Sequence, residues 1–94
     1  MIIGVLTLEI LIPTSASLKD KRMVLNKIKD KSKKYNISIA EIEFQDKWQR
    51  AGIAIVTVSS ANALVQEILN KVFSQLDSDY TFEIIRYNFD YING

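Results

Sequence analysis

The sequence predicts an α+β fold in which one antiparallel sheet of four strands carries two helices. Two strand-like segments, residues 37–44 and 52–58, are separated only by a short polar stretch, which is typical of a hairpin. A segment with helical periodicity lies on each side of this hairpin, and a further strand-like segment lies beyond each helix. The order of elements is therefore strand, helix, strand, strand, helix, strand.

The composition limits both the size of the structure and its chemistry. The 94 residues are 48% hydrophobic and 24% charged, which suits one globular domain spanning residues 1–94. There is no cysteine and no histidine, which excludes disulfides, thiolate nucleophiles, imidazole bases and the usual ligands of zinc and haem. We therefore expect no metal and no cofactor. Without a long apolar run or a basic leader segment, a cytoplasmic protein with no membrane contact is expected.

Residues 2–12 are expected to form the first strand. Its two faces differ, since one mixes polar and apolar side chains and the other is uniformly apolar. The apolar face, which should meet the helices, consists of Leu6, Leu8, Ile10 and Ile12. Pro13 has no amide hydrogen to donate to a strand ladder and should end the strand.

The first helix is predicted from a capping motif followed by an apolar stripe. Ser17 and Asp20 have the spacing of a capping box, in which the serine accepts from first-turn amides and the aspartate reaches back. Asn36 is expected to end the helix in the left-handed conformation. The stripe recurs at helical spacing and consists of Leu18, Leu25, Ile28 and Tyr35.

The first helix also concentrates the positive charge of the chain. It contains eight of the twelve basic residues, although the net charge is only +1. A solvated lysine face is the simpler interpretation, because lysine-rich exposed helices are common. The alternative is a patch that binds phosphate backbones or acidic protein surfaces. The candidate contact residues of that patch are Lys19, Lys21, Arg22, Lys27, Lys31 and Lys34.

The hairpin carries two further candidate sites. In its polar stretch, Trp48 and Arg50 are residue types that dominate binding hot spots, so this segment is a candidate contact loop. Equally, Trp48 could fold back as an anchor of the hairpin while Arg50 pairs with Asp46. In the preceding strand, Ser38, Ala40, Ile42 and Phe44 alternate with a second set that contains Glu41 and Glu43. These carboxylates are interpreted as solvated charges on an edge strand rather than as a metal or acid–base pair.

The last two elements are predicted with the same patterns. Residues 61–76 have the apolar spacing of an amphipathic helix, and Ser59 or Ser60 should supply its N-cap. Residues 80–92 should form the last strand. Aromatic residues alternate along this strand and are expected on the open face of the sheet, where they would pack in a homodimer. These residues are Tyr87, Phe89 and Tyr91.

Right-handed crossovers with both helices on one side of the sheet give a ferredoxin-like sandwich with strand order 4-1-3-2. Such a sandwich leaves one sheet face uncovered, and apolar side chains on an open face usually mark an interface. A homodimer through this face or through the last strand is therefore expected.

Residues 17–22, SLKDKR, match the motif SLKxKR, and residues 36–51 match a second motif, NVSVAExxxQDxWQRA. With these two motifs the sequence resembles the YlxP-like family of small bacterial proteins of unknown function (DUF503). The resemblance covers essentially the whole chain. The matching positions are Ser17, Leu18, Lys19, Lys21, Arg22, Glu41, Gln45, Asp46, Trp48, Gln49 and Arg50. Phe44 departs from the pattern, since family members often have a small or polar residue there.

The resemblance implies a ferredoxin-like fold and a bacterial cytosolic protein whose relatives are encoded near translation-initiation and ribosome-maturation factors. It implies no established reaction and therefore no catalytic residues. The leading hypothesis is a non-catalytic module that binds ribosomal RNA or the small ribosomal subunit through the basic helix, Trp48 and Arg50. The alternative is a protein-interaction or homodimeric module in which the motif residues hold the hairpin to the first helix. A phosphate-directed hydrolase such as an acylphosphatase is disfavoured, because the loop of residues 13–17 has no arginine.

Overall fold

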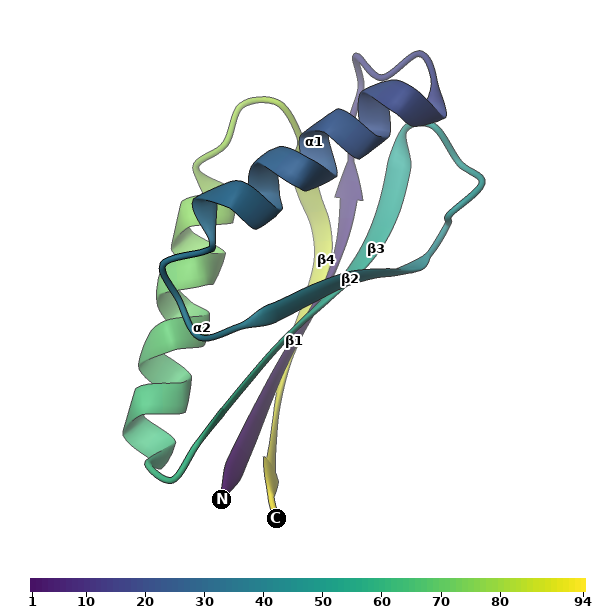
Figure 1. Cartoon of the computed structure of the whole chain (residues 1–94). Helices are drawn as coiled ribbons and strands as arrows, with labels where there is room; N and C mark the ends of the chain where they lie inside the picture. The colour runs from purple at the N-terminus through teal and green to yellow at the C-terminus, as the bar shows by residue number, and fades with distance from the viewer.

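The computed structural model describes residues 1–94 and contains the six predicted elements in the predicted order (Figure 1). They form one antiparallel sheet with the order β2-β3-β1-β4, with both helices on the same face. This arrangement confirms the α+β, ferredoxin-like fold. The elements are β1 (Ile2–Leu11), α1 (Leu18–Lys31), β2 (Ser38–Glu43), β3 (Arg50–Ser59), α2 (Asn62–Asp77) and β4 (Glu83–Asn93).

The core lies between the sheet and the helices, but the two helices contribute to it unequally. The predicted apolar face of β1 is buried. The only buried residues of α1 are Ile28 and a lysine, Lys21. In contrast, α2 buries four apolar side chains, which are Val65, Leu69, Val72 and Leu76. Neither helix has the length and apolar content needed to span a bilayer.

The close packing of α2 depends on Gly4 in the central strand β1. A Cβ atom added at Gly4 would clash with Cγ1 of Val65 and would lie 2.8 Å from Cδ1 of Leu69. Only the absence of a side chain at this position lets α2 approach the sheet backbone so closely.

Three predicted element boundaries were wrong. α1 ends at Lys31 with Ser32 as its C-cap, so Tyr35 and Asn36 lie beyond the helix, and Asn36 does not adopt the left-handed conformation. The N-cap of α2 is Ala61, which has no side-chain oxygen, and Ser59 instead accepts a hydrogen bond from its amide at 3.1 Å. β4 begins at Glu83, three residues later than predicted.

The predicted orientation of β2 was reversed. Ile39 and Glu41 lie opposite Ile55 and Ile53, whose side chains belong to the core, so they face the helices. Ile42 alternates with the glutamates that were interpreted as solvated and was therefore expected to face the interior, but it is 45% exposed. The register with β3 therefore directs a glutamate toward the protein interior.

The aromatic residues of β4 also lie on the other face than predicted. Tyr87 and Phe89 are opposite Leu8 and Leu6 of β1, which are core residues, so both rings lie on the helix side. Phe73 of α2 packs against them, with ring centroids 4.7 Å from Tyr87 and 5.6 Å from Phe89. On the open face, β4 instead presents Arg86, Asn88, Asp90 and Ile92, beside the predicted Val5, Thr7, Glu9 and Leu11 of β1.

Candidate functional site

Lys21 lies at the centre of the family-motif region and is buried. It follows the same helical spacing as Leu25 and Ile28, so it occupies a core position on α1 and is only 2% exposed. Its ammonium group donates hydrogen bonds to three main-chain oxygens, two in the segment that joins β2 to β3 and one in the first residue of β3. These are the oxygens of Phe44 at 2.8 Å, Gln45 at 3.3 Å and Arg50 at 3.2 Å.

The charge of Lys21 is balanced by Glu41, the residue that β2 turns inward. Glu41 Oε2 lies 2.8 Å from Lys21 Nζ, yet it accepts no hydrogen bond. The contact between the two side chains is therefore an ion pair, in which the carboxylate compensates the charge of the ammonium group. We call this group, Lys21 with Glu41 and the oxygens of Phe44, Gln45 and Arg50, the Lys21 clamp.

The clamp holds a strained turn. Phe44 has φ of 61°, and no other residue of the chain has a positive φ. A bulky side chain in the left-handed region costs about 1–2 kcal/mol. The Phe44 oxygen accepts from Lys21 and also from the amide of Lys47 at 2.9 Å, which closes the turn. The strain thus occurs where two hydrogen bonds fix the backbone.

Gln49 connects this turn to the loop that precedes α1, and Ser17 connects that loop to the helix. Gln49 Nε2 donates to the oxygens of Pro13 at 3.2 Å and Ser15 at 3.1 Å. Ser17 caps α1 by accepting from the amide of Asp20 at 3.1 Å, as predicted, whereas the Asp20 carboxylate accepts from Ala16. The motif residues therefore join the hairpin, the β1–α1 loop and α1 into one unit.

Arg50 is held between two side chains. Its guanidinium contacts Glu9 Oε2 at 2.8 and 3.2 Å, and its Cζ lies 4.6 Å from the centroid of the Phe44 ring. The predicted pairing of Arg50 with Asp46 was wrong, because β1 and β3 are adjacent and bring Glu9 within reach.

Trp48 is 54% exposed, so of the two alternatives considered for it, the one in which it folds back as an anchor of the hairpin was wrong. It lies with Leu11, Phe44 and Arg50 around a surface hollow of about 530 Å³, which is otherwise lined by Asp46, Lys47 and Gln49. We call residues 45–49 the Trp48 loop. The backbone of this loop is fixed by the Lys21 clamp and by Gln49, while the Trp48 side chain is exposed on the surface.

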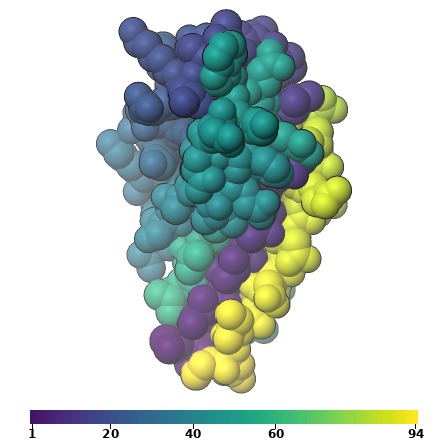
Figure 2. Space-filling view, turned by 90° about the vertical axis from the view of Figure 1, so that its right-hand side faces the viewer, coloured from purple at the N-terminus to yellow at the C-terminus, as the bar shows by residue number.

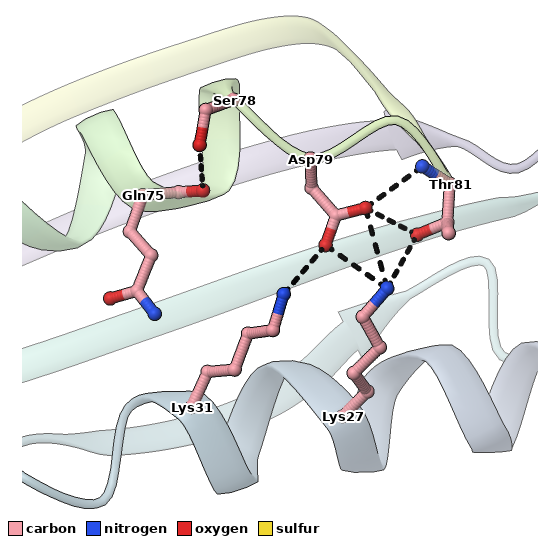
Figure 3. Close-up of polar contacts among 6 residues, drawn as sticks. All are labelled: Lys27, Lys31, Gln75, Ser78, Asp79 and Thr81. Carbon is pink, nitrogen blue, oxygen red and sulfur yellow. Dashed lines mark hydrogen bonds and ion pairs between the residues drawn. The ribbon is translucent and has the colours of Figure 1, made fainter.

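A second ionic group holds the other end of α1. Lys27 and Lys31 both point to Asp79 in the α2–β4 loop, with Nζ to Oδ2 distances of 3.3 and 3.5 Å (Figure 3). Burial alone would raise the pKa of Asp79. Hydrogen bonds from the Thr81 hydroxyl and amide and from Lys27 outweigh burial and lower the pKa to about 2.

The predicted basic patch is therefore divided. Lys21 is enclosed in the protein and cannot reach a phosphate, so its assignment as a contact residue was wrong, and Lys27 and Lys31 are engaged by Asp79. Lys34 lies over the ring of Tyr35. The cations of α1 that are exposed and have no ion-pair partner are Lys19, Arg22 and Lys29.

The site contains no metal-binding constellation, because no three histidine, cysteine, aspartate or glutamate side chains come together. Two ion-pair partners were not predicted from the sequence, namely Glu9, which pairs with Arg50, and Asp79, which pairs with Lys27 and Lys31. Nothing local marks them, since each contacts a residue about 40 or more positions away. The core position of Lys21 did have a signal, which was its spacing to Leu25 and Ile28.

The fold and the site together define a small ferredoxin-like protein whose hairpin is braced by a buried lysine from its first helix. The chain belongs to the DUF503 family, described as a protein of unknown function, whose sequence model matches residues 3–89. It is 40% identical over 77 residues to a Bacillus subtilis (strain 168) protein named "Uncharacterized protein YlxP". The match covers 81% of this chain and 84% of that protein.

Proposed function

We propose that the protein is a non-catalytic module that binds RNA through the exposed face of α1 and the Trp48 loop. The observation that carries this proposal is the exposed Trp48 on a loop fixed by the Lys21 clamp, next to cations without ion-pair partners. Tryptophan supplies a stacking surface for unpaired bases, and lysine and arginine supply phosphate contacts.

The two halves of this surface are contiguous. Arg22 of α1 and Gln45 of the Trp48 loop line the same small hollow. Figure 2 shows α1 and the β2–β3 segment side by side in the upper half of the molecule. Lys19, Arg22 and Lys29 are three and seven residues apart, which places them along one exposed strip of the helix.

The clamp supports binding by fixing the loop before the partner arrives. Loop residues that must be ordered on binding reduce affinity, whereas a loop already held in place avoids this cost. The turn is held by three hydrogen bonds from the buried Lys21 ammonium group, and burying a charged group carries an unfavourable desolvation free energy. We infer that the loop conformation itself is what the partner recognises.

The proposal is tested by titrating binding with salt, using purified small ribosomal subunits and an unstructured RNA as ligands. Lys19→Glu/Arg22→Glu should weaken binding and reduce the slope of log affinity against log salt by about 2. Trp48→Ala should weaken binding with little change in this slope, because stacking releases no counterions. A matched control compares the single variant Lys19→Glu with Lys71→Glu on α2. Both variants change the net charge by the same amount, but only Lys19 lies on the proposed surface.

Lys21 is unsuitable for this test because its replacement would release the turn and destabilise the protein. Binding that is absent at low salt, or that does not depend on salt, would contradict the proposal. Equal weakening by Lys71→Glu and Lys19→Glu would also contradict it, since it would show nonspecific attraction to the whole protein.

A further inference from the structure

The two edges of the sheet are built differently. β2 has six residues, two glutamates and a register irregularity opposite Gly52, which are features that discourage pairing with another chain. β4 also has charged residues and one register irregularity, between Ile84 and Arg86, but it is eleven residues long, contains no proline or lysine, and has no strand on its outer side. Figure 2 shows this strand, in yellow, as a continuous ridge along one margin of the molecule. Its regular pairing with β1 extends from Arg86 to Asn93.

We propose that β4 pairs antiparallel with β4 of a second copy of this chain, about a two-fold axis at Asn88. Opposite residues in an antiparallel pair share one face of the sheet. Within the regular segment, residues on one face of the strand are either all even-numbered or all odd-numbered. Two residues that lie opposite each other across a two-fold axis must therefore both be even-numbered or both be odd-numbered, which places the axis at a residue and not between two residues. Asn88 is the middle residue of β4, and about this axis the regularly paired residues 86–90 of the two copies lie opposite one another.

This register makes the charges of the edge complementary. It places Arg86 opposite Asp90 of the second copy, and Asp90 opposite Arg86 of that copy, both on the open face. Neither residue has an ion-pair partner within its own chain, since Glu9 beside Arg86 is held by Arg50. Moving the axis to Tyr87 or Phe89 would place Arg86 opposite Asn88 or Ile92 instead. Only the central register matches the two charges.

The same register also matches the helix side of the edge. Tyr87 would lie opposite Phe89 of the second copy, next to the aromatic group that each chain forms with Phe73. Tyr87 is 56% exposed in the single chain, so pairing would cover an aromatic surface that the fold leaves open. Aromatic pairs across strands are among the favourable neighbours in sheets. This inference is independent of the RNA-binding proposal.

Charge reversal tests the register. Sedimentation of the wild-type protein at high micromolar concentration should show a dimer. Arg86→Glu alone and Asp90→Arg alone should each raise the dissociation constant by about tenfold or more, because each places two pairs of like charges across the axis. A mixture of the two variants should recover the dimer, since both cross-strand pairs are then complementary. Circular dichroism of each variant establishes that it is folded.

A cysteine at the axis provides an independent test, because the chain contains none. Residues directly opposite in an antiparallel pair have Cα atoms about 4.5–5.5 Å apart, which a disulfide can span. Asn88→Cys should therefore form a covalent dimer under mild oxidation, and the control Asn26→Cys on α1 should not. A wild-type monomer, failure of the mixed variants to associate, or equal cross-linking at both cysteines would overturn the proposal.

Discussion

The ammonium nitrogen of Lys21 lies 2.8 Å from the main-chain oxygen of Phe44, the one residue of the chain with a left-handed backbone. A buried charge from α1 thus stabilises the most strained residue of the β2–β3 turn. Since the turn carries Trp48, the position of the exposed tryptophan depends on a side chain 27 residues earlier in the sequence.

Lys21→Met should destabilise the protein by about 3 kcal/mol. The change removes the partner of Glu41 and leaves three carbonyls without their donor, and an unpaired buried charge is costly. Urea unfolding at neutral pH measures the free energy of unfolding. Adding Glu41→Gln to this variant should restore part of the loss, while Lys33→Met on the exposed Asp30 pair should have little effect. If Lys21→Met and Lys33→Met lowered the free energy of unfolding by similar amounts, the Lys21 clamp would contribute no more to stability than an exposed ion pair.

At position 44, glycine should be more favourable than alanine, the reverse of the usual order. Both substitutions remove the ring beneath Arg50, but only glycine adopts φ of 61° without steric cost. Phe44→Gly should therefore be more stable than Phe44→Ala by about 1 kcal/mol. The difference between their thermal melting temperatures provides the measurement, and a higher value for the alanine variant would contradict the left-handed assignment.

Stability should decrease in acid partly through Asp79. Its pKa is lowered from 3.8 to about 2 in the folded protein, so its contribution is complete above pH 5 and is lost as the pH falls from about 4 to 2. The contribution is about 2 kcal/mol. Asp79→Asn should have a smaller difference in unfolding free energy between pH 6 and pH 2.5 than the wild type. Equal differences in the two proteins would assign the acid sensitivity to other carboxylates.

Gly4→Ala should destabilise the protein by about 1–3 kcal/mol, because the added methyl group would overlap Val65 and Leu69 of α2. The second substitution Val65→Ala should recover part of this loss by making room for the methyl group. Calorimetric unfolding of the wild type and of the single and double variants gives the coupling energy. Purely additive effects would show that the two sites do not share the proposed contact.

The fold could be predicted from the sequence because the order of elements and the handedness of crossovers leave few topologies. The buried face of β1 was also predictable, because a face with four aliphatic side chains is far more stable against the helices than in water. The two faces of β2 were predicted in reverse, because a glutamate considered alone is expected to face solvent and Glu41 instead faces the helices. Its partner Lys21 lies 20 residues earlier, and strand periodicity carries no information about that pairing.

The side-chain orientation along β4 depends on tertiary register. The irregularity opposite Glu9 and Ile10 shifts the pairing by one residue, and a one-residue shift exchanges the two faces of a strand. Nothing in the alternation of Tyr87 and Phe89 shows where that shift occurs. The lysines of α1 were likewise interpreted as one patch, because helical spacing cannot show that Asp79 engages two of them from another loop.

The two helices differ in how they are attached to the sheet, and this difference has a consequence for local opening. α2 is held by four buried apolar side chains, whereas α1 combines one, Ile28, with ionic contacts at Lys21 and at Asp79. Attraction between partly exposed charges weakens as ions are added, and apolar burial does not. Amide hydrogens of α1 should therefore exchange with solvent at a rate that responds to ionic strength, while those of α2 should exchange only on global unfolding. Of the two helices that cover the sheet, one is therefore sensitive to ionic strength and the other is not.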